Sequence, residues 1–399
     1  MYINYNLNHN YQTARIISTY TADVSGVCSA LFELGGMSVI HDASGCNSTY
    51  NTHDEPRWYD FDSMVFLSGI SEMEAIMGND EKLIHDVISA AEQLSPKFIA
   101  LAGTPIPMMV GTDFKAIASV IEKQTGIPCM GIPTNGMHTY VQGVSMAMQT
   151  LAEKFVTESM PKTKKISVNL LGVTPLDFSL NGSVQHMHDL LNQNQIEVVS
   201  CWCMGDSLEN LKLAPSAHVN LVVSYAGIGA AEYLAKKFGI PYLIARPYGK
   251  AFSSEIIRAI RNLSDYPKNQ KNLQNSVLCR NQEIPGNPEI IMIGEGISSE
   301  SLARAIERET GKTVGTIIAT EYDTNFLSEN ARIARDEAEL IPILKNPDLK
   351  YLIADPLYQP ICPKSVKFIR LGHEGFSGRI YHDLMPDLTE DLHWILNQL

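Results

Sequence analysis

Short apolar, β-branched runs alternate with amphipathic stretches along this chain. The expected strands are Met37–His41, Ser63–Leu67, Lys97–Ala102, Ile166–Leu171, Ile196–Cys201, Val219–Ser224, Pro241–Ala245, Glu289–Ile293, Thr316–Thr320, Lys350–Ala354 and Val366–Arg370. Helical spacing of apolar residues recurs between many of them, over Glu72–Leu94, Phe114–Thr125, Val141–Val156, Ala230–Phe238 and Ser299–Thr310. Because parallel strands need crossover connections, this alternation predicts an α/β protein with doubly wound parallel sheets. Ligands of such sheets bind at the carboxyl ends of the strands.

Two polar stretches divide this pattern. Residues 160–165 read MPKTKK and precede a new series of strands and helices, and residues 264–288 are long, polar and rich in Asn and Pro. A chain of 399 residues is also too long for one ordinary core. We therefore expect three α/β domains, over residues 1–162, 163–265 and 266–399, the last with a C-terminal helix.

Composition narrows the classes of function. The chain is 45% hydrophobic and 19% charged, as an ordinary globular protein is, and its net charge of −13 argues against nucleic-acid binding. That charge suits docking to a basic protein partner, although solubility alone is a sufficient reason for it. The polar start MYINYNLNHNYQTAR is unlike a signal peptide, and no run of 18 apolar residues suggests a membrane span. Seven scattered cysteines do not form a disulfide framework, so we expect reduced thiols and a cytoplasmic location.

Two cysteines bracket the segment CSALFELGGMSVIHDASGC. Cys28 is expected in the first turn of a helix, after a cap at Asp23 or Ser25, and Cys46 in the loop after the strand Met37–His41. Both places offer free backbone N–H groups, which stabilise thiolates, and two thiolates make half of a four-cysteine iron–sulfur site. The other half would come from another subunit. A cysteine in an apolar helix is also commonly a small buried hydrophobe, so spacing alone leaves both interpretations of Cys28 open.

The remaining candidate chemistry is carried by histidines. His373 follows the strand Val366–Arg370, and His41 ends its strand directly before Asp42. Both therefore lie at carboxyl ends of strands, although a lone histidine is more often structural than catalytic. The chain contains no G-x-x-x-x-G-K-[ST] motif, so the sequence does not predict ATP hydrolysis by this chain.

Several segments together resemble a known family. They are VIHDASGC followed by TYNTHDEP, ALAGTPIPMMVGTDF, VNLLGVTPLD with AAEYLAKKFGIPYL, and RLGH with SGRIYH. In their order and spacing the chain resembles the α and β subunits of nitrogenase component 1 and their relatives, from about Asp23 to its C-terminus. The resemblance implies three Rossmann-like domains, and it matches Cys28 and Cys46 to the first two cluster cysteines.

The chain departs from that family at two ligands. The place of the third cluster cysteine is taken by about Pro105, which excludes the usual three-cysteine contribution to an eight-iron cluster. We therefore expect a 4Fe-4S cluster that is shared across a dimer interface. The cofactor-binding cysteine is replaced by Ser224 or Val223, whereas His373 aligns with the cofactor histidine. A molybdenum–iron cofactor and dinitrogen reduction are therefore not expected.

The resemblance implies a nitrogenase-like oxidoreductase component. A separate ATP-dependent iron–sulfur reductase would dock and supply low-potential electrons through the cluster at Cys28 and Cys46. His373, His41 and Asp42 would then orient the substrate or deliver protons. The substrate would be a tetrapyrrole or a small molecule reduced at a second metal cofactor, in a homodimer or a heterotetramer with a paralogous subunit.

Two other classes of function stay open. The first is a non-catalytic scaffold for metal-cluster assembly, because the loss of ligands is compatible with that role. The second is an α/β protein that binds a small ligand between its domains. The polar N-terminus and the pair formed by Cys28 and Cys46 count against this second class.

Overall fold

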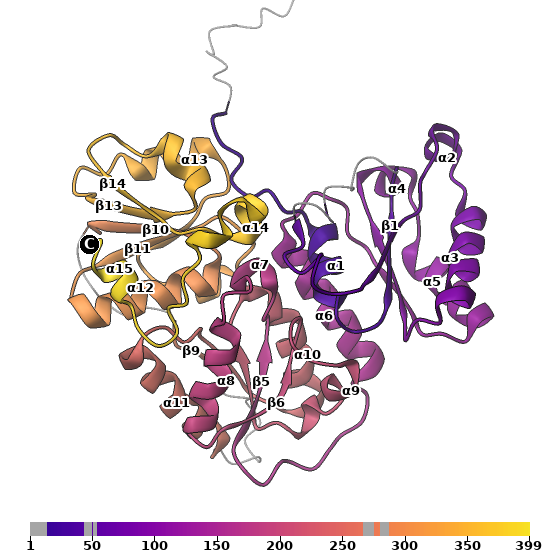
Figure 1. Ribbon diagram of the computed structural model, residues 1–399, viewed down its shortest axis with the longest axis horizontal. Helices are drawn as coiled ribbons and strands as arrows, with labels where there is room; N and C mark the ends of the chain where they lie inside the picture. The colour runs from indigo at the N-terminus through magenta and orange to yellow at the C-terminus, as the bar shows by residue number, and fades with distance from the viewer. Residues whose placement is uncertain (1–13, 44–49, 51–53, 266–274, 280–286) are drawn as a thin grey trace, which may run out of the picture.

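The chain folds into three lobes, each built on a parallel β-sheet (Figure 1). The computed structural model describes residues 14–43, 50, 54–265, 275–279 and 287–399. Cys46 and much of the polar stretch 264–288 lie outside these ranges. The expected α/β class with several doubly wound parallel sheets is confirmed.

The N-terminal lobe holds a four-stranded sheet in the order β2-β1-β3-β4. Its strands are β1 (Met37–His41), β2 (Met64–Leu67), β3 (Ile99–Gly103) and β4 (Cys129–Ile132). Its helices are α1 (Asp23–Leu31), α2 (Glu72–Met77), α3 (Asp80–Leu94), α4 (Pro105–Val110), α5 (Phe114–Thr125) and α6 (Tyr140–Phe155). The central strands β1 and β3 are almost wholly buried, which explains why both are nearly continuous apolar runs.

The middle lobe holds a five-stranded sheet in the order β6-β5-β7-β8-β9. Its strands are β5 (Ser167–Leu171), β6 (Glu197–Cys201), β7 (Val219–Val222), β8 (Tyr242–Ile244) and β9 (Ser276–Val277). Its helices are α7 (Pro175–Phe178), α8 (Ser183–Gln193), α9 (Leu208–Leu211), α10 (Ile228–Phe238) and α11 (Lys250–Ser264), with the short 3-10 helices η2 (Ala214–Ser216) and η3 (Tyr225–Gly227).

The C-terminal lobe holds a five-stranded sheet in the order β12-β11-β10-β13-β14. Its strands are β10 (Ile290–Gly294), β11 (Val314–Ile318), β12 (Ala331–Ile333), β13 (Tyr351–Ala354) and β14 (Lys367–Arg370). Its helices are α12 (Gly296–Thr310), α13 (Glu337–Leu344), α14 (Glu374–Ser377) and α15 (His393–Leu396), with η4 (Thr324–Phe326), η5 (Pro356–Ile361) and η6 (Gly378–Leu384).

Some local expectations differ from the structure. The stretch Glu72–Leu94 is two helices, because Gly78 ends α2 with a φ of 71° and the Asn79 side chain caps α3. Strand β4 was not expected, since CMGI is short and carries little pattern. Strand β9 lies in the stretch that was expected to be a connector. Among the described residues, none of the helices combines the length and apolar character that a membrane crossing requires.

The three lobes meet around α1, α6, α7 and α14 (Figure 1). One continuous apolar cluster runs through all three lobes, from Val27 through Ala226 to Ile293. Helices α1 and α6 cross closely, because Gly26 and Gly143 each sit where a side chain would collide with the other helix's backbone. The segment before α1 also reaches the C-terminal lobe, where Thr21 N–H donates to the carbonyl of Gly375. This junction places residues from distant parts of the sequence side by side.

Candidate functional site

Side chains from different lobes converge on one buried carboxylate, that of Asp177. Asp177 lies in α7, just beyond the carboxyl end of β5, and its side chain is fully buried. The phenol of Tyr140, the first residue of α6, donates a hydrogen bond to its Oδ1 atom. His373, which follows β14, brings Nε2 to 3.2 Å from the same oxygen. The carboxyl ends of strands thus face a common point, as doubly wound sheets predict.

The polar atoms at this point are incompletely partnered. Oδ2 of Asp177 and both ring nitrogens of His373 are buried and make no hydrogen bond with any described residue. The 3.2 Å approach of Nε2 to Oδ1 is therefore a close contact between charged or chargeable groups without hydrogen-bond alignment. Buried polar groups without partners are rare, and at functional sites they often await a ligand, a water or a proton transfer.

Surrounding residues fix the His373 ring in place. The ring stacks on Phe376, with centroids 4.2 Å apart and an interplanar angle of 22°. Asp355, at the end of β13, accepts hydrogen bonds from His373 N–H at 2.9 Å and Ser377 Oγ at 2.7 Å. Burial raises the pKa of Asp355, and these hydrogen bonds oppose the rise. The start of α14 is thereby anchored to the end of a central strand.

Tyr140 keeps its proton in this setting. Burial, and then the charge of Asp177, raise the pKa of Tyr140 well above its ordinary value. The phenol is therefore a hydrogen-bond donor to Asp177 throughout the physiological range. Its ring passes directly over Gly375, where a Cβ atom would lie 2.4 Å from Cε1. Only glycine leaves room for this arrangement.

A cleft opens beside the convergence point, between the middle and C-terminal lobes. Its volume is about 560 Å³, counted with the open solvent at its mouth. Asp177, Arg246 and Tyr248 line it from the middle lobe, and Glu295 and His373 line it from the C-terminal lobe. A cleft that combines apolar walls with a few polar groups is typical of a small-molecule site.

Glu295 contributes a second buried carboxyl group to this cleft. It follows β10 and caps α12, accepting from Ile297 N–H at 3.1 Å and Ser298 N–H at 2.8 Å. It also accepts from the N–H of Tyr225 at 2.9 Å, which ties the two lobes together. Burial, and then the charge of Asp177, raise its pKa, whereas the three hydrogen bonds oppose the rise. Glu295 therefore takes up a proton at higher pH than an exposed glutamate would.

Cys28 lies away from water in α1. The helix begins at Asp23, so Cys28 is in its second turn, and the expectation of the first turn is wrong. Its thiol has no exposed surface, and its pKa is raised by burial and by the nearby carboxylates of Glu55 and Asp54. Arg57 is also buried here, with its Nε 2.7 Å from Glu55 and its Nη1 2.7 Å from Glu33.

The described residues do not by themselves fit an iron–sulfur cluster at this place. Cys28 is the one cysteine that they supply of the expected pair, because Cys46 lies outside the described ranges. No group of three or more His, Cys, Asp or Glu side chains within those ranges is arranged to hold a metal ion. A cluster would need ligands beyond those that the described residues supply.

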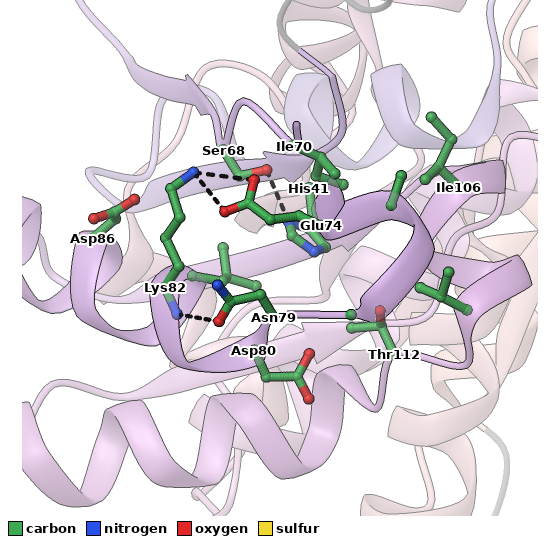
Figure 2. Close-up of a pocket in the computed structure, with 14 residues that line it drawn as sticks. His41, Ser68, Ile70, Glu74, Asn79, Asp80, Lys82, Asp86, Ile106 and Thr112 are labelled. Carbon is green, nitrogen blue, oxygen red and sulfur yellow. Dashed lines mark hydrogen bonds and ion pairs between the residues drawn. The ribbon is translucent and has the colours of Figure 1, made fainter. Parts of the chain in front are cut away.

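His41 lies at another cavity, in the N-terminal lobe. Figure 2 shows His41 among Ser68, Glu74 and Lys82, with its Nδ1 2.8 Å from Ser68 Oγ. Burial lowers the pKa of His41, which favours the neutral ring. Asp42 is buried beside it, and the Oδ1 atom of Asp42 accepts from Ala43 N–H at 2.8 Å. The structure does not bring these two residues to the cleft that His373 lines, so their catalytic role stays a prediction.

Sequence reasoning missed most of the residues around His373. Asp177 stands in VTPLD after an expected strand, and Glu295 stands in a G-E-G turn after another. Both therefore carried the strand-end signal that pointed to His373. Arg246 carried it too, because it directly follows the expected strand Pro241–Ala245, whereas Tyr140 carried no such signal at the start of a helix.

Comparison with known proteins places the chain among its relatives. The family described as nitrogenase component 1 type oxidoreductase matches residues 24–346. The chain is 24% identical over 289 residues to a light-independent protochlorophyllide reductase subunit from Gloeothece citriformis, covering 65% of this chain and 56% of that protein. It is 24% identical over 269 residues to the nitrogenase iron-molybdenum cofactor biosynthesis protein NifE of Rhodobacter capsulatus, covering 63% and 56%.

A third relative and a solved structure agree with these matches. The nitrogenase molybdenum-iron protein alpha chain of Clostridium pasteurianum is 25% identical over 211 residues, covering 52% of this chain and 39% of that protein. The solved structure of nitrogenase Cp1 at pH 6.5 superimposes with a TM-score of 0.71 at 17% identity, over 98% of this chain and 93% of that chain. The match to the solved structure concerns the fold, and the chain spans about half the length of the first two relatives.

Proposed function

The chain belongs to the nitrogenase component 1 type oxidoreductase family, and we propose that it is the catalytic component of a nitrogenase-like reductase. In this proposal a separate ATP-dependent iron–sulfur reductase, similar to the nitrogenase iron protein, supplies low-potential electrons. The substrate is reduced in the cleft beside His373, and it is a tetrapyrrole or a small molecule. The functional unit is a homodimer or an assembly with a paralogous subunit.

The observation that supports this proposal most is the unpartnered His373 ring beside Asp177. Each electron that an organic substrate takes up must be matched by a proton, and a buried imidazole next to a carboxylate suits proton delivery. The Asp177 carboxylate lies 3.2 Å from Nε2, and the Tyr140 phenol holds that carboxylate in position. Stacking on Phe376 limits rotation of the ring. His373 is therefore proposed as the proton donor.

The proposed cofactor is a 4Fe-4S cluster shared by two subunits, with Cys28 and Cys46 as the ligands from this chain. This part rests on the family and on the sequence, because the described residues supply Cys28 alone of the pair. When bound, such a cluster accepts and passes on single electrons. We propose that His41 and Asp42 assist proton delivery or substrate orientation from the N-terminal lobe, outside the cleft that His373 lines.

The test is electron uptake by protein purified without oxygen. The chain is mixed with a reduced iron-protein-like reductase and ATP, and oxidation of the reductase is followed by its absorbance. We expect iron in the protein and ATP-dependent uptake, both lost in Cys46→Ala and both kept in the matched control Cys279→Ala. Cys279 is a suitable control because its thiol is buried near the Tyr322 hydroxyl and it is not one of the two proposed ligands. Iron-free, colourless wild-type protein would contradict the proposal of an iron–sulfur cluster.

A second candidate function is a scaffold on which a metal cluster is assembled. The match to a cofactor biosynthesis protein, at the same identity as the match to a reductase, supports it. The same experiment separates the two functions. A scaffold would contain iron and release it to an acceptor protein, and it would take up no electrons when the reductase and ATP are added.

A further inference from the structure

Arg246 is a buried cation without an anionic partner among the described residues. It lies two residues after β8, is 7% exposed, and lines the cleft beside His373. No carboxylate of the described residues forms an ion pair with it. Removing an unpaired charge from water is costly, so buried charges are normally paired. The position of Arg246 therefore calls for an explanation.

Neutral groups hold the guanidinium in place. Its Nη1 atom donates to the backbone carbonyl of Asp177 at 3.1 Å and to Ser298 Oγ at 3.0 Å. Its carbon centre lies 3.7 Å from the centroid of the Phe178 ring and 5.0 Å from that of Tyr248. These contacts fix one edge of the planar group and leave its remaining donors without a hydrogen bond to a described residue.

The carboxyl groups of the cleft accept their hydrogen bonds from groups other than Arg246. Asp177 accepts a hydrogen bond from the Tyr140 phenol, and Glu295 accepts hydrogen bonds from three backbone N–H groups. His373 is the other group here that can carry a positive charge. The charges that face the cleft therefore leave Arg246 free to pair with an incoming anion.

Much of the remaining cleft wall is apolar, although Asn181, Ser298 and Ser299 also line it. The residues that line it with aliphatic or thioether side chains are Met292, Ile293, Leu302, Leu371, Met385 and Leu388. Contact between these apolar side chains and the uncharged part of an organic ligand is favourable, because it removes apolar surface from water. A small hydrated ion makes no such contact. A guanidinium with free donors in a plane matches the two oxygens of a carboxylate.

We propose that this cleft binds an organic carboxylate whose apolar body packs against these walls while its carboxylate pairs with Arg246. The proposal rests on the proposed function and narrows the substrate class, because a carboxylate held there lies in the same cleft as His373. It selects substrates with an acidic side chain or terminus over neutral ones.

The test uses two probes of the same shape and different charge, 3-phenylpropionate and 3-phenylpropionamide. Each is titrated by NMR into the iron-containing protein purified without oxygen, with no reductase and no ATP. We expect the carboxylate to bind wild-type protein at least about tenfold more tightly than the amide. Arg246→Gln should weaken carboxylate binding by the same factor. The exposed Arg258→Gln on α11, which removes the same charge, should leave it unchanged.

Equal affinities of the two probes for wild-type protein, or no binding of either, would overturn the proposal. Unchanged binding by folded Arg246→Gln would do the same. If Arg246→Gln fails to fold, the comparison of the two probes on wild-type protein still decides. Because no electrons are involved, carboxylate binding without electron uptake would refute the reductase and leave the anion site standing, whereas uptake without carboxylate binding would refute the site alone.

Discussion

Nε2 of His373 lies 3.2 Å from Oδ1 of Asp177, although the two residues are far apart in the chain and belong to different lobes. The contact exists because α7 and α14 both begin just beyond carboxyl ends of strands and pack together where the lobes meet. This pair connects the architecture of the protein with its proposed chemistry.

Replacing Asp177 with Asn should slow proton delivery and leave electron uptake intact. The amide keeps the shape of the side chain but removes the carboxylate that faces the His373 ring. We expect steady-state dithionite oxidation through the reductase, with protons as acceptor, to fall about 10²-fold or more. The first transfer of electrons from the reductase should be unchanged. Equal steady-state rates in Asp177→Asn and the exposed control Asp348→Asn would contradict the role of Asp177.

Adding a methyl group at Gly375 should destabilise the junction of the lobes. A Cβ there would lie 2.4 Å from Cε1 and 2.7 Å from Cζ of Tyr140, which is fully buried and cannot move aside freely. We expect Gly375→Ala to lower the free energy of unfolding in urea by about 1–3 kcal/mol. Combining it with Tyr140→Leu should recover part of that loss, because the collision is removed. Strictly additive losses would show that the two residues do not interact.

His186 should stabilise the fold more at acidic than at alkaline pH. Its hydrogen bond to Asp387, and then the charge of Asp387, raise its pKa above the ordinary value near 6.5. A raised pKa of a histidine contributes stability that is full below the unfolded pKa and is lost as the pH rises through the folded pKa.

We therefore expect His186→Gln to destabilise the protein more at pH 5.5 than at pH 9, by a small margin, since the histidine is partly exposed to solvent. Urea unfolding at the two pH values measures the difference. His393→Gln, at an exposed position on α15, is the control. An effect of His186→Gln that is larger at pH 9 than at pH 5.5 would reverse the predicted sign.

Cys28 should resist alkylation in folded, iron-free protein. The thiolate is the reactive form, and burial together with Glu55 and Asp54 raises the pKa of this thiol. We expect iodoacetamide at pH 8 to modify the half-buried Cys362 first, and to reach Cys28 after unfolding in urea. Peptide mass spectrometry reads both sites. Modification of Cys28 at the rate of Cys362 in the folded state would show that α1 opens readily.

The sequence alone determined the class of fold and one residue of the cleft. The spacing of apolar residues along the chain indicates whether a segment is a strand or a helix. Most strands of all three sheets could therefore be predicted from local sequence. His373 could be singled out because it follows a strand, and the carboxyl end of a strand is where ligands of doubly wound sheets bind. The same logic selected His41 and Asp42, which lie at a strand end in a different lobe.

Only the tertiary structure decided which strand ends face one another. Tyr140, Asp177, Arg246 and His373 meet because three lobes pack around α6, α7 and α14, and no local pattern encodes that packing. The burial of Arg246 without a carboxylate among the described residues, and the two unpartnered nitrogens of His373, are likewise properties of the assembled lobes. Local periodicity specifies the elements, whereas the chemistry of the cleft depends on contacts between residues far apart in the chain.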